Sequence, residues 1–278
     1  MKSKKSNPPS KLRYTFRTLD DPLLKNALSG VSLLNGKEPY FLVGGIATQS
    51  YLPSVCRRPT ADVDFSVVRP LNYQDFKSMA FPMIEYFKDL GYSVDIKKKS
   101  RSFNLNISDS KGEAITMEFS RRNENSFNRS KNRLEKELEN SNVKIVEGGN
   151  KSYHVTRVED IIVPKLVRSV GSLIRNPSFS RYLSTKIKPL SDSKIKANLN
   201  KISELREEVI TNMSNIYLAE KLRFFSDLYD SRVLFEIVGA NKKYFSEGFN
   251  SWKVFSKNFE KSKQIMNSIF PEDFLKSL

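Results

Sequence analysis

Cysteine and histidine are almost absent from this sequence, which has one of each, Cys56 and His154, among 278 residues. A lone cysteine cannot close an internal disulfide, and one cysteine with one histidine cannot supply a Cys/His structural zinc site. Long apolar runs are also absent, since no stretch approaches the roughly 20 residues that cross a bilayer. The opening residues MKSKKSNPPS lack the apolar core of a secretion signal. These absences predict a cytoplasmic protein with no membrane association.

Acidic residues are outnumbered, because 31 Asp and Glu stand against 47 Lys and Arg and leave a formal net charge of +16. A positive surplus of this size attracts polyanions through the release of their counterions, so nucleic acid is the first partner to consider. A dispersed surplus that serves solubility alone is the alternative. With 38% hydrophobic residues, the chain has enough apolar side chains for one large or two modest domains.

Composition and periodicity divide the chain into three parts. Residues 1–19 begin with a basic, proline-containing segment that cannot bury its own surface, so we predict a disordered arm. Residues 20–155 alternate strand-like and helix-like patterns, which predicts an α/β (α+β) domain with a mixed sheet. From residue 156 helical patterns dominate, and 156–278 is predicted to be a helical domain. A Ser-, Lys- and Asn-rich stretch at about 169–200 separates its two helical regions.

Period-two alternation from Tyr92 onward predicts three antiparallel strands, and short apolar runs predict three more. The six predicted strands lie in PYFLVGG, DVDFSVV, YSVDIKKK, SFNLNIS, AITMEFS and NVKIVEGG. Residues 121–142 are dominated by charge and asparagine and are predicted to be a solvated helix or loop.

Helix signals lie between these strands. Asp21 followed by Pro22 predicts a capped helix start, and apolar residues at helical spacing predict a helix that begins near residue 73 and ends at Gly91. Thr156 and Glu159 have the spacing of a capping box, which predicts the start of the first helix of the helical domain.

Two aspartates, Asp62 and Asp64, stand one residue apart in DVDFSVV. Alternate side chains of a strand share a face, so these carboxylates lie roughly 7 Å apart on one face while Val63 and Phe65 turn to the core. Like charges this close repel each other, and a divalent cation with oxygen ligands, Mg²⁺ or Mn²⁺, relieves the repulsion. An ordinary half-exposed strand is the alternative.

Glu118 is the candidate for a third carboxylate. It lies on the polar side of AITMEFS, where apolar and polar residues alternate. If this strand neighbours DVDFSVV, the three carboxylates converge and can hold two metal ions roughly 3.5–4 Å apart, an arrangement that supports in-line nucleotidyl transfer. A simple exposed strand residue is the alternative.

The segment before the aspartates contains residues suited to phosphate. Gly44 and Gly45 follow a buried strand, and glycines at such a turn let backbone amides approach a phosphate. Arg58 and Thr60 then lead into the strand with the aspartates.

LVGGIATQSYL followed by RRPTADVDF resembles the first motif of the nucleotidyltransferase superfamily with the DNA polymerase β-like fold, and within it the AbiEii/AbiGii (MenA-like) toxin family. The pattern consists of G-G-x-A, a variable connector, an Arg-x-Ser/Thr element and a D-x-D-F element. Its matches here are Gly44, Gly45, Ala47, Arg58, Thr60, Asp62, Asp64 and Phe65. The resemblance covers roughly residues 38–240 and implies a polymerase β-like catalytic domain with a mixed sheet, followed by a helical domain.

Two later segments resemble further motifs of that family. VEDIIVPKL implies that Lys165 contacts the nucleotide, and RFFSDLYD implies a role for Arg223, Asp227 and Asp230. The local pattern leaves other interpretations open. Lys165 also fits an ordinary surface lysine just after a proline that should kink the helix, and the aspartate pair fits a solvated helix face.

These residues predict a metal-dependent nucleotidyltransferase that moves an NMP from an NTP such as ATP to an acceptor hydroxyl. Asp62 and Asp64 would hold Mg²⁺ or Mn²⁺, and Glu118 would activate the acceptor, directly or through a second metal ion. The predicted nucleotide-binding residues are Gly44, Gly45, Arg58, Thr60, Lys165 and Asp227.

The positive charge favours RNA, such as a tRNA 3′ end, as the acceptor. The family resemblance also implies a toxin with an antitoxin protein as its partner. Two alternatives stay open: a small-molecule nucleotidyltransferase of the antibiotic-modifying type, which needs less basic surface, and a non-catalytic RNA-binding protein on the same fold, which does not need the acids.

Overall fold

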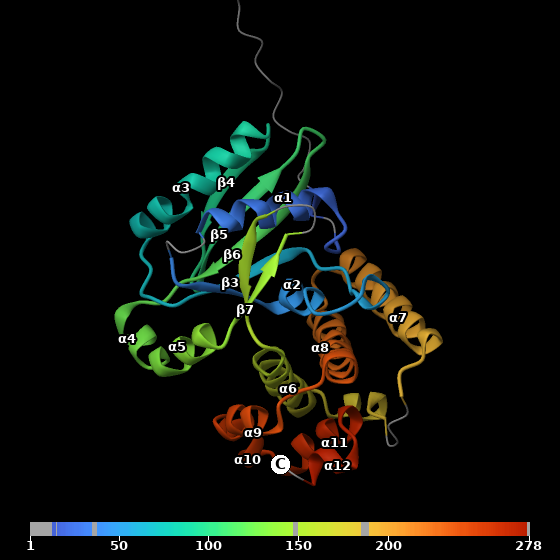
Figure 1. The fold of residues 1–278 in the computed structure, drawn as a ribbon. Helices are drawn as coiled ribbons and strands as arrows, with labels where there is room; N and C mark the ends of the chain where they lie inside the picture. The colour runs from blue at the N-terminus through green and yellow to red at the C-terminus, as the bar shows by residue number, and fades with distance from the viewer. Residues whose placement is uncertain (1–12, 15, 35–37, 147–149, 185–188, 277–278) are drawn as a thin grey trace, which may run out of the picture. The chain divides into compact units, whose positions relative to one another are not determined.

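The computed structural model describes residues 13–14, 16–34, 38–146, 150–184 and 189–276 (Figure 1). The chain forms two compact units. Unit 1 consists of Met1–Ala47 and Pro59–Thr156, and unit 2 of Thr48–Arg58 and Arg157–Leu278. Unit 1 contains a mixed sheet with helices and unit 2 is helical, so the predicted fold class is confirmed. The domain limits at 19/20 and 155/156 stay a prediction.

Unit 1 is built on a sheet in which the strands follow the order β4-β5-β6-β3-β2-β8-β7, with β1 paired to β6. The strands are β1 (Arg13–Tyr14), β2 (Tyr40–Val43), β3 (Asp62–Val67), β4 (Ser93–Lys98), β5 (Ser102–Ser108), β6 (Glu113–Ser120), β7 (Asn142–Ile145) and β8 (Ser152–Val155). β4, β5 and β6 are antiparallel neighbours, as predicted. β6 runs parallel to β3, and β8 runs parallel to β2, which makes the sheet mixed.

One face of this sheet is apolar and forms the core of unit 1. Phe65 and Phe119 stack with their ring centroids 4.4 Å apart, and Phe76 contacts Phe119 from α3 (Tyr73–Asp89). α1 (Pro22–Val31) packs against α3 and β6. The Asp21 side chain accepts hydrogen bonds from the Leu23 and Leu24 amides and caps α1, which confirms the predicted start.

The end of α3 also agrees with the prediction. Gly91 follows the last turn with a φ of 81°, in the left-handed region that glycine adopts without strain. Residues 121–142 were predicted to be a solvated helix or loop, and they contain the helices α4 (Glu124–Asn128) and α5 (Lys131–Glu139). Phe127 and Leu134 of these helices are buried with Phe41 and Val68, so that prediction is wrong for their apolar face.

The disordered arm predicted for residues 1–19 does not extend through Arg13. β1 pairs with β6 in parallel, and Arg17 forms a backbone bridge with Thr60. The buried Arg17 side chain donates to Asp21 at 2.6 Å and to Glu113 at 2.7 Å, contacts that hold this part of the chain on the sheet. The prediction for residues 1–12 lies outside the described residues.

The described residues of unit 2 form helices, before and after residues 185–188, which the structure does not describe. They are η2 (Ser54–Cys56), α6 (Val158–Arg175), η3 (Pro177–Tyr182), α7 (Asp192–Thr211), α8 (Ile216–Val238), α9 (Lys242–Asn250), α10 (Lys253–Lys257), α11 (Phe259–Ile269) and α12 (Glu272–Leu275). α2 (Gly44–Gln49) crosses from unit 1 into unit 2. In the parts of the chain that the structure describes, no helix is both long and apolar enough to span a bilayer.

Two expectations about unit 2 need correction. The stretch at 169–200 is largely helical, because α6 continues to Arg175 and α7 begins at Asp192. Pro164 lies inside α6, and the kink expected there stays a prediction. The capping box is not formed: Arg157 is the N-cap residue, and the Glu159 carboxylate accepts hydrogen bonds from Arg157 Nε at 3.3 Å and from the Asn241 amide at 2.6 Å.

Gly30 tests the packing of α1 against α3. A Cβ at this position would lie 2.4 Å from Phe87 Cζ, inside a buried contact. We expect Gly30→Ala to lower the free energy of unfolding by about 1–2 kcal/mol, because over-packing outweighs the helix-propensity gain of about 0.5–1 kcal/mol. Urea denaturation followed by circular dichroism measures this change.

The matched control is Gly171→Ala in α6. Its Cβ would lie 3.4 Å from the flexible Arg175 side chain, so this change should be neutral or stabilise by a few tenths of a kcal/mol. Equal effects of the two substitutions would contradict the packing explanation.

Candidate functional site

The three predicted catalytic carboxylates lie on one face of the sheet of unit 1. β3 and β6 are parallel neighbours, and their register places Asp64 opposite Glu118 and Asp62 opposite Thr116. Neighbouring strands are about 4.8 Å apart and alternate side chains share a face, so the three acids form one polar group on the face opposite Phe65 and Phe119. The condition that the sequence analysis set for these acids to lie together, adjacency of the two strands, is met.

Asp62 and Glu118 have different local environments. The exposed Asp62 accepts a hydrogen bond from Thr60 Oγ1 at 2.9 Å. Glu118 accepts from Asn104 Nδ2 at 3.3 Å and pairs with Lys99 Nζ at 3.5 Å. Among the described residues, no three His, Cys, Asp or Glu side chains are placed so that together they could hold a metal ion. The three acids share a face without forming such a group, and their role as metal ligands stays a prediction.

The two glycines of the first motif fit closely around residues of this face. Gly44 has a φ of 70°, and a Cβ on it would lie 2.3 Å from Asp64 Oδ2. A Cβ on Gly45 would lie 2.8 Å from Thr60 Oγ1. Both positions require glycine because the Asp64 carboxylate and the Thr60 hydroxyl occupy the space of a side chain. The predicted contact of these glycines with phosphate is a separate matter and stays a prediction.

The same face continues onto β5 with amide side chains that the sequence analysis did not select. Asn104 lies opposite Glu118, and Asn106 lies opposite Thr116. Asn106 Oδ1 accepts a hydrogen bond from Thr116 Oγ1 at 2.9 Å, whereas its buried Nδ2 has no hydrogen-bond partner within the described structure. The alternation of SFNLNIS, which places both asparagines on one face, is the signal that could have identified them.

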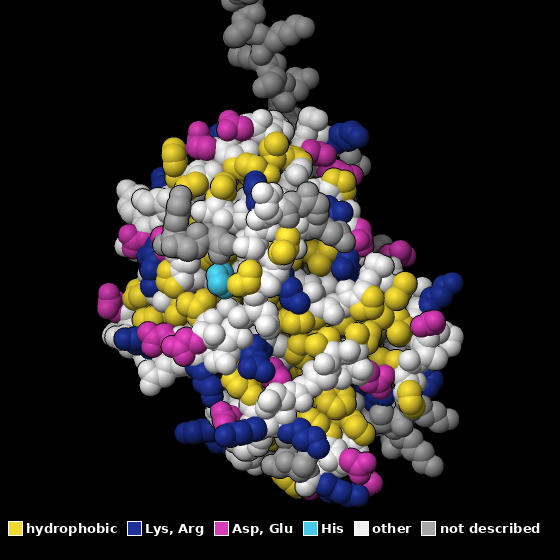
Figure 2. Space-filling view, viewed as in Figure 1, with side chains coloured by type: hydrophobic (Ala, Val, Ile, Leu, Met, Phe, Trp, Pro, Cys, Tyr) yellow, Lys and Arg dark blue, Asp and Glu magenta, His cyan; other side chains and the backbone are white. Residues whose placement is uncertain are grey.

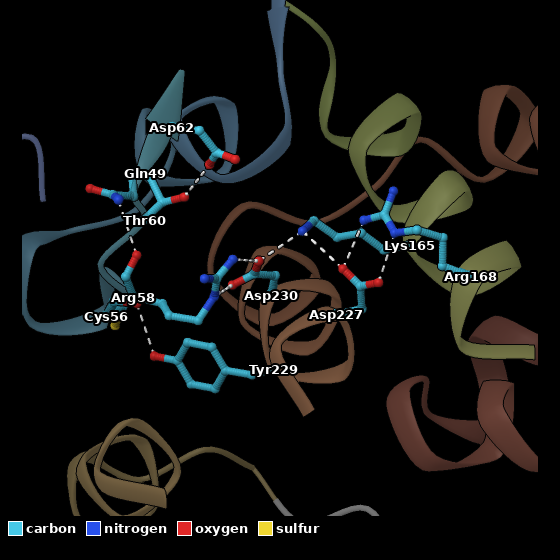
Figure 3. Close-up of polar contacts among 10 residues, drawn as sticks. All are labelled: Gln49, Cys56, Arg58, Thr60, Asp62, Lys165, Arg168, Asp227, Tyr229 and Asp230. Atoms are coloured by element: carbon cyan, nitrogen blue, oxygen red, sulfur yellow. Dashed lines mark hydrogen bonds and ion pairs between the residues drawn. The ribbon is translucent and has the colours of Figure 1, made fainter. Parts of the chain in front are cut away.

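Unit 2 brings together Arg58, Lys165, Asp227 and Asp230, the residues of the other motif matches, in one buried ion-pair network (Figure 3). Arg58 binds Asp230 through Nε at 3.2 Å and Nη2 at 2.8 Å. Lys165 Nζ donates to Asp230 at 2.8 Å and to Asp227 at 3.3 Å. Arg168, which the sequence analysis did not select, binds Asp227 through two nitrogens at 2.8 and 2.9 Å.

Burial decides between the interpretations that the sequence left open. Lys165 is 3% exposed, Asp227 4% and Asp230 1%. Lys165 is therefore not an ordinary surface lysine, and the aspartate pair is not a solvated helix face. Arg223 is exposed and does not belong to the network. Contacts of Lys165, Asp227 and Arg58 with a nucleotide stay a prediction.

Further hydrogen bonds of unit 2 involve residues 48–58. Tyr229 Oη donates to the Cys56 carbonyl at 2.9 Å, and Gln49 Nε2 donates to the Arg58 carbonyl at 3.0 Å (Figure 3). Burial and the charge of Arg58 lower the pKa of Arg206 to about 10.

Comparisons with known proteins give limited information. No family model matches the chain, and no curated protein matches it. Among solved structures it is similar to an antigenic nucleotidyltransferase-like protein from Paracoccidioides brasiliensis, with a TM-score of 0.37 and 15% identity. The match covers 67% of this chain and 90% of that chain. A similarity of this extent does not establish an activity.

The ion-pair network predicts which of two substitutions lowers the free energy of unfolding more. In Lys165→Met both carboxylates keep an arginine, so we expect the free energy of unfolding to fall by about 1.5–3 kcal/mol, the range for hydrogen bonds to charged groups. Asp230→Asn leaves Arg58 without its carboxylate, so we expect a larger loss of about 3–5 kcal/mol. Urea denaturation measures both, with the exposed Lys263→Met as the control. A Lys165→Met effect no larger than that of the control would contradict the network.

Asp230 also predicts a pH dependence of stability. Burial raises its pKa, but the charges of Arg58 and Lys165 and their hydrogen bonds outweigh burial and lower the pKa from 3.8 to about 2. A carboxylate with a depressed pKa stabilises the fold above its unfolded pKa, and this stability is lost as the pH falls through the folded pKa. The lowered pKa of Asp230 contributes about 2 kcal/mol to the free energy of unfolding, and this contribution is lost between about pH 4 and pH 2.

We expect the free energy of unfolding of Asp230→Asn to fall less between pH 5 and pH 2 than that of the wild type, because the variant has no carboxylate to protonate at this position. The control is Asp95→Asn, because the Asp95 side chain is 59% exposed. An Asp230→Asn variant with the same pH dependence as the wild type would contradict the assignment.

Proposed function

We propose that this protein is a nucleotidyltransferase that transfers an NMP from an NTP to an acceptor hydroxyl. The observation that carries the proposal is the β3–β6 register, which places Glu118 directly opposite Asp64 and on the face that Asp62 shares.

The donor set suits Mg²⁺ or Mn²⁺, which prefer carboxylate oxygens, and Asp62 and Asp64 are the residues that would hold such an ion. A bound divalent cation supplies charge neutralisation of the triphosphate and orients it. In the proposed reaction the acceptor oxygen forms a bond to the α-phosphorus and pyrophosphate leaves. Glu118 takes the proton of the acceptor hydroxyl, with Asn104 and Lys99 orienting its carboxylate.

The unpartnered Asn106 Nδ2 suits an oxygen of the substrate. It is a buried amide donor on the same face, opposite Thr116 on the strand that carries Glu118. Leaving such a donor without a partner costs free energy, and a phosphate or ribose oxygen would recover that cost. Asn106 would therefore position the substrate.

The acceptor in this proposal is RNA, such as a tRNA 3′ end, because the net charge of +16 favours a polyanion. On the face drawn in Figure 2, Lys and Arg side chains are interspersed with Asp and Glu. Charge supports RNA over an antibiotic-type small molecule, and the paired acids support catalysis over RNA binding alone. A toxin role with an antitoxin partner rests on the family resemblance.

The test is incubation of the full chain with each labelled NTP, Mg²⁺ and total RNA, followed by measurement of acid-precipitable label. We expect one or more nucleotides to be incorporated by the wild type. Asp64→Asn and Glu118→Gln should each lose at least about 100-fold in rate, the lower range for loss of a general base or a key electrostatic group. Glu85→Gln on the exposed side of α3 is the charge-matched control and should retain the wild-type rate.

Each alternative gives a different result. Label on an aminoglycoside or other small alcohol, with none on RNA, would support the antibiotic-type enzyme. RNA binding without incorporation of any nucleotide would support the non-catalytic protein. Full activity of Asp64→Asn would exclude the proposed site.

A further inference from the structure

A second possible binding site lies in unit 2, in a pocket with a volume of about 420 Å³. It opens among η3, α7, α8 and α11, and α7 and α8 lie side by side (Figure 1). Its volume falls within the roughly 300–1,000 Å³ typical of small-ligand sites. It is large enough to accept one nucleotide unit of a longer chain.

Aromatic and aliphatic side chains form the apolar part of this pocket. Tyr182 and Phe225 line it with their ring centroids 4.9 Å apart, and Leu228 and Ile202 lie beside them. Tyr182 and Phe225 are only partly buried. A base can stack on such rings whatever its sequence, because every base has a π-face.

Cations surround the two rings. Lys221 Nζ lies 5.7 Å from the Tyr182 centroid, and Lys201 Nζ lies 5.7 Å from the Phe225 centroid. The Arg181 guanidinium lies 4.9 Å from the Tyr182 centroid and donates to Tyr182 Oη at 2.8 Å. Within the described structure none of these three cations pairs with a carboxylate, so their charges are available to a phosphate.

Other polar groups of the pocket are already engaged. Arg232 pairs with Glu236 and donates to the Ile269 carbonyl at 3.0 Å. Lys194 Nζ donates to the Pro189 carbonyl at 3.3 Å, which leaves further donors on its ammonium. Desolvation raises the pKa of Tyr182, but the Arg181 hydrogen bond and the charges of Lys221 and Lys201 lower it overall.

We propose that this aromatic and basic pocket binds a nucleotide of a single-stranded RNA, with the base stacked on Tyr182 or Phe225 and the flanking phosphates paired with Lys201, Lys221 and Arg181. Because three cations lie beside the rings, the pocket suits an anionic ligand with flat bases, such as RNA, better than an apolar molecule, which would gain nothing from the cations. The inference rests on the proposed function only in that the RNA acceptor would be its ligand.

The experiment measures binding of a short labelled single-stranded RNA by fluorescence anisotropy between about 50 and 200 mM salt. It uses the full chain carrying Asp64→Asn, so that binding is measured without transfer. We expect Tyr182→Leu to weaken binding about tenfold, within the range for loss of one base–aromatic stack. The double change Lys201→Gln with Lys221→Gln should reduce the slope of log K against log salt by about 1.4, since each contact to a single strand contributes about 0.7.

Matched controls remove the same groups elsewhere in unit 2. Phe259→Leu removes an aromatic ring that is 64% exposed, and Lys257→Gln with Lys263→Gln removes two charges from α10 and α11. Both controls should bind RNA as the parent does. Circular dichroism establishes that each variant is folded.

Two results separate this inference from the proposed function. If transfer to RNA occurs but the pocket variants bind RNA no more weakly than the controls, the pocket assignment is overturned and the transferase stands. If no nucleotide is incorporated but RNA binding falls in the pocket variants alone, the transferase fails and the pocket assignment holds.

Discussion

The parallel pairing of β3 with β6 is the constraint on which unit 1 depends. Its register sets Phe65 opposite Phe119 on one face and Asp64 opposite Glu118 on the other. Because a slip of one residue would turn every side chain to the other face, burying the stacked rings also fixes the row of acids. The same hydrophobic contact that stabilises the core therefore decides which carboxylates become neighbours.

Alternation along one strand was enough to predict that Asp62 and Asp64 share a face. The order of the strands in the sheet could not be predicted from such local patterns. Asp62 and Asp64 share a face because of the geometry of a single strand. β8 (SYHV) was not predicted, and it gains its place by pairing with β2, more than a hundred residues earlier. Arg17 was assigned to the arm because its partner Glu113 is equally remote.

In unit 2, helical periodicity did not predict which charged residues are buried. A carboxylate pair at i,i+3 on a helix usually faces water, but here Asp227 and Asp230 are buried because Arg58, Lys165 and Arg168 neutralise them. Burying a charge is costly unless a partner is buried with it. The burial of any one of these residues therefore cannot be predicted from its own place in the sequence. The resemblance noted in the sequence selected Arg58, Lys165, Asp227 and Asp230 separately, and the ion pairs explain why these four residues occur together.

The motif residues divide into those that packing requires and those that it does not. Gly44 and Gly45 leave space for Asp64 and Thr60, and Arg58 neutralises a buried carboxylate, so the fold alone accounts for them. Glu118 differs, because like charges directly opposite each other on neighbouring strands destabilise a sheet. Its side chain is 39% exposed and a neutral glutamine would fit the same strand. The structure gives Glu118 a cation, Lys99 at 3.5 Å, and an amide donor, Asn104 at 3.3 Å, so packing tolerates this acid without requiring it.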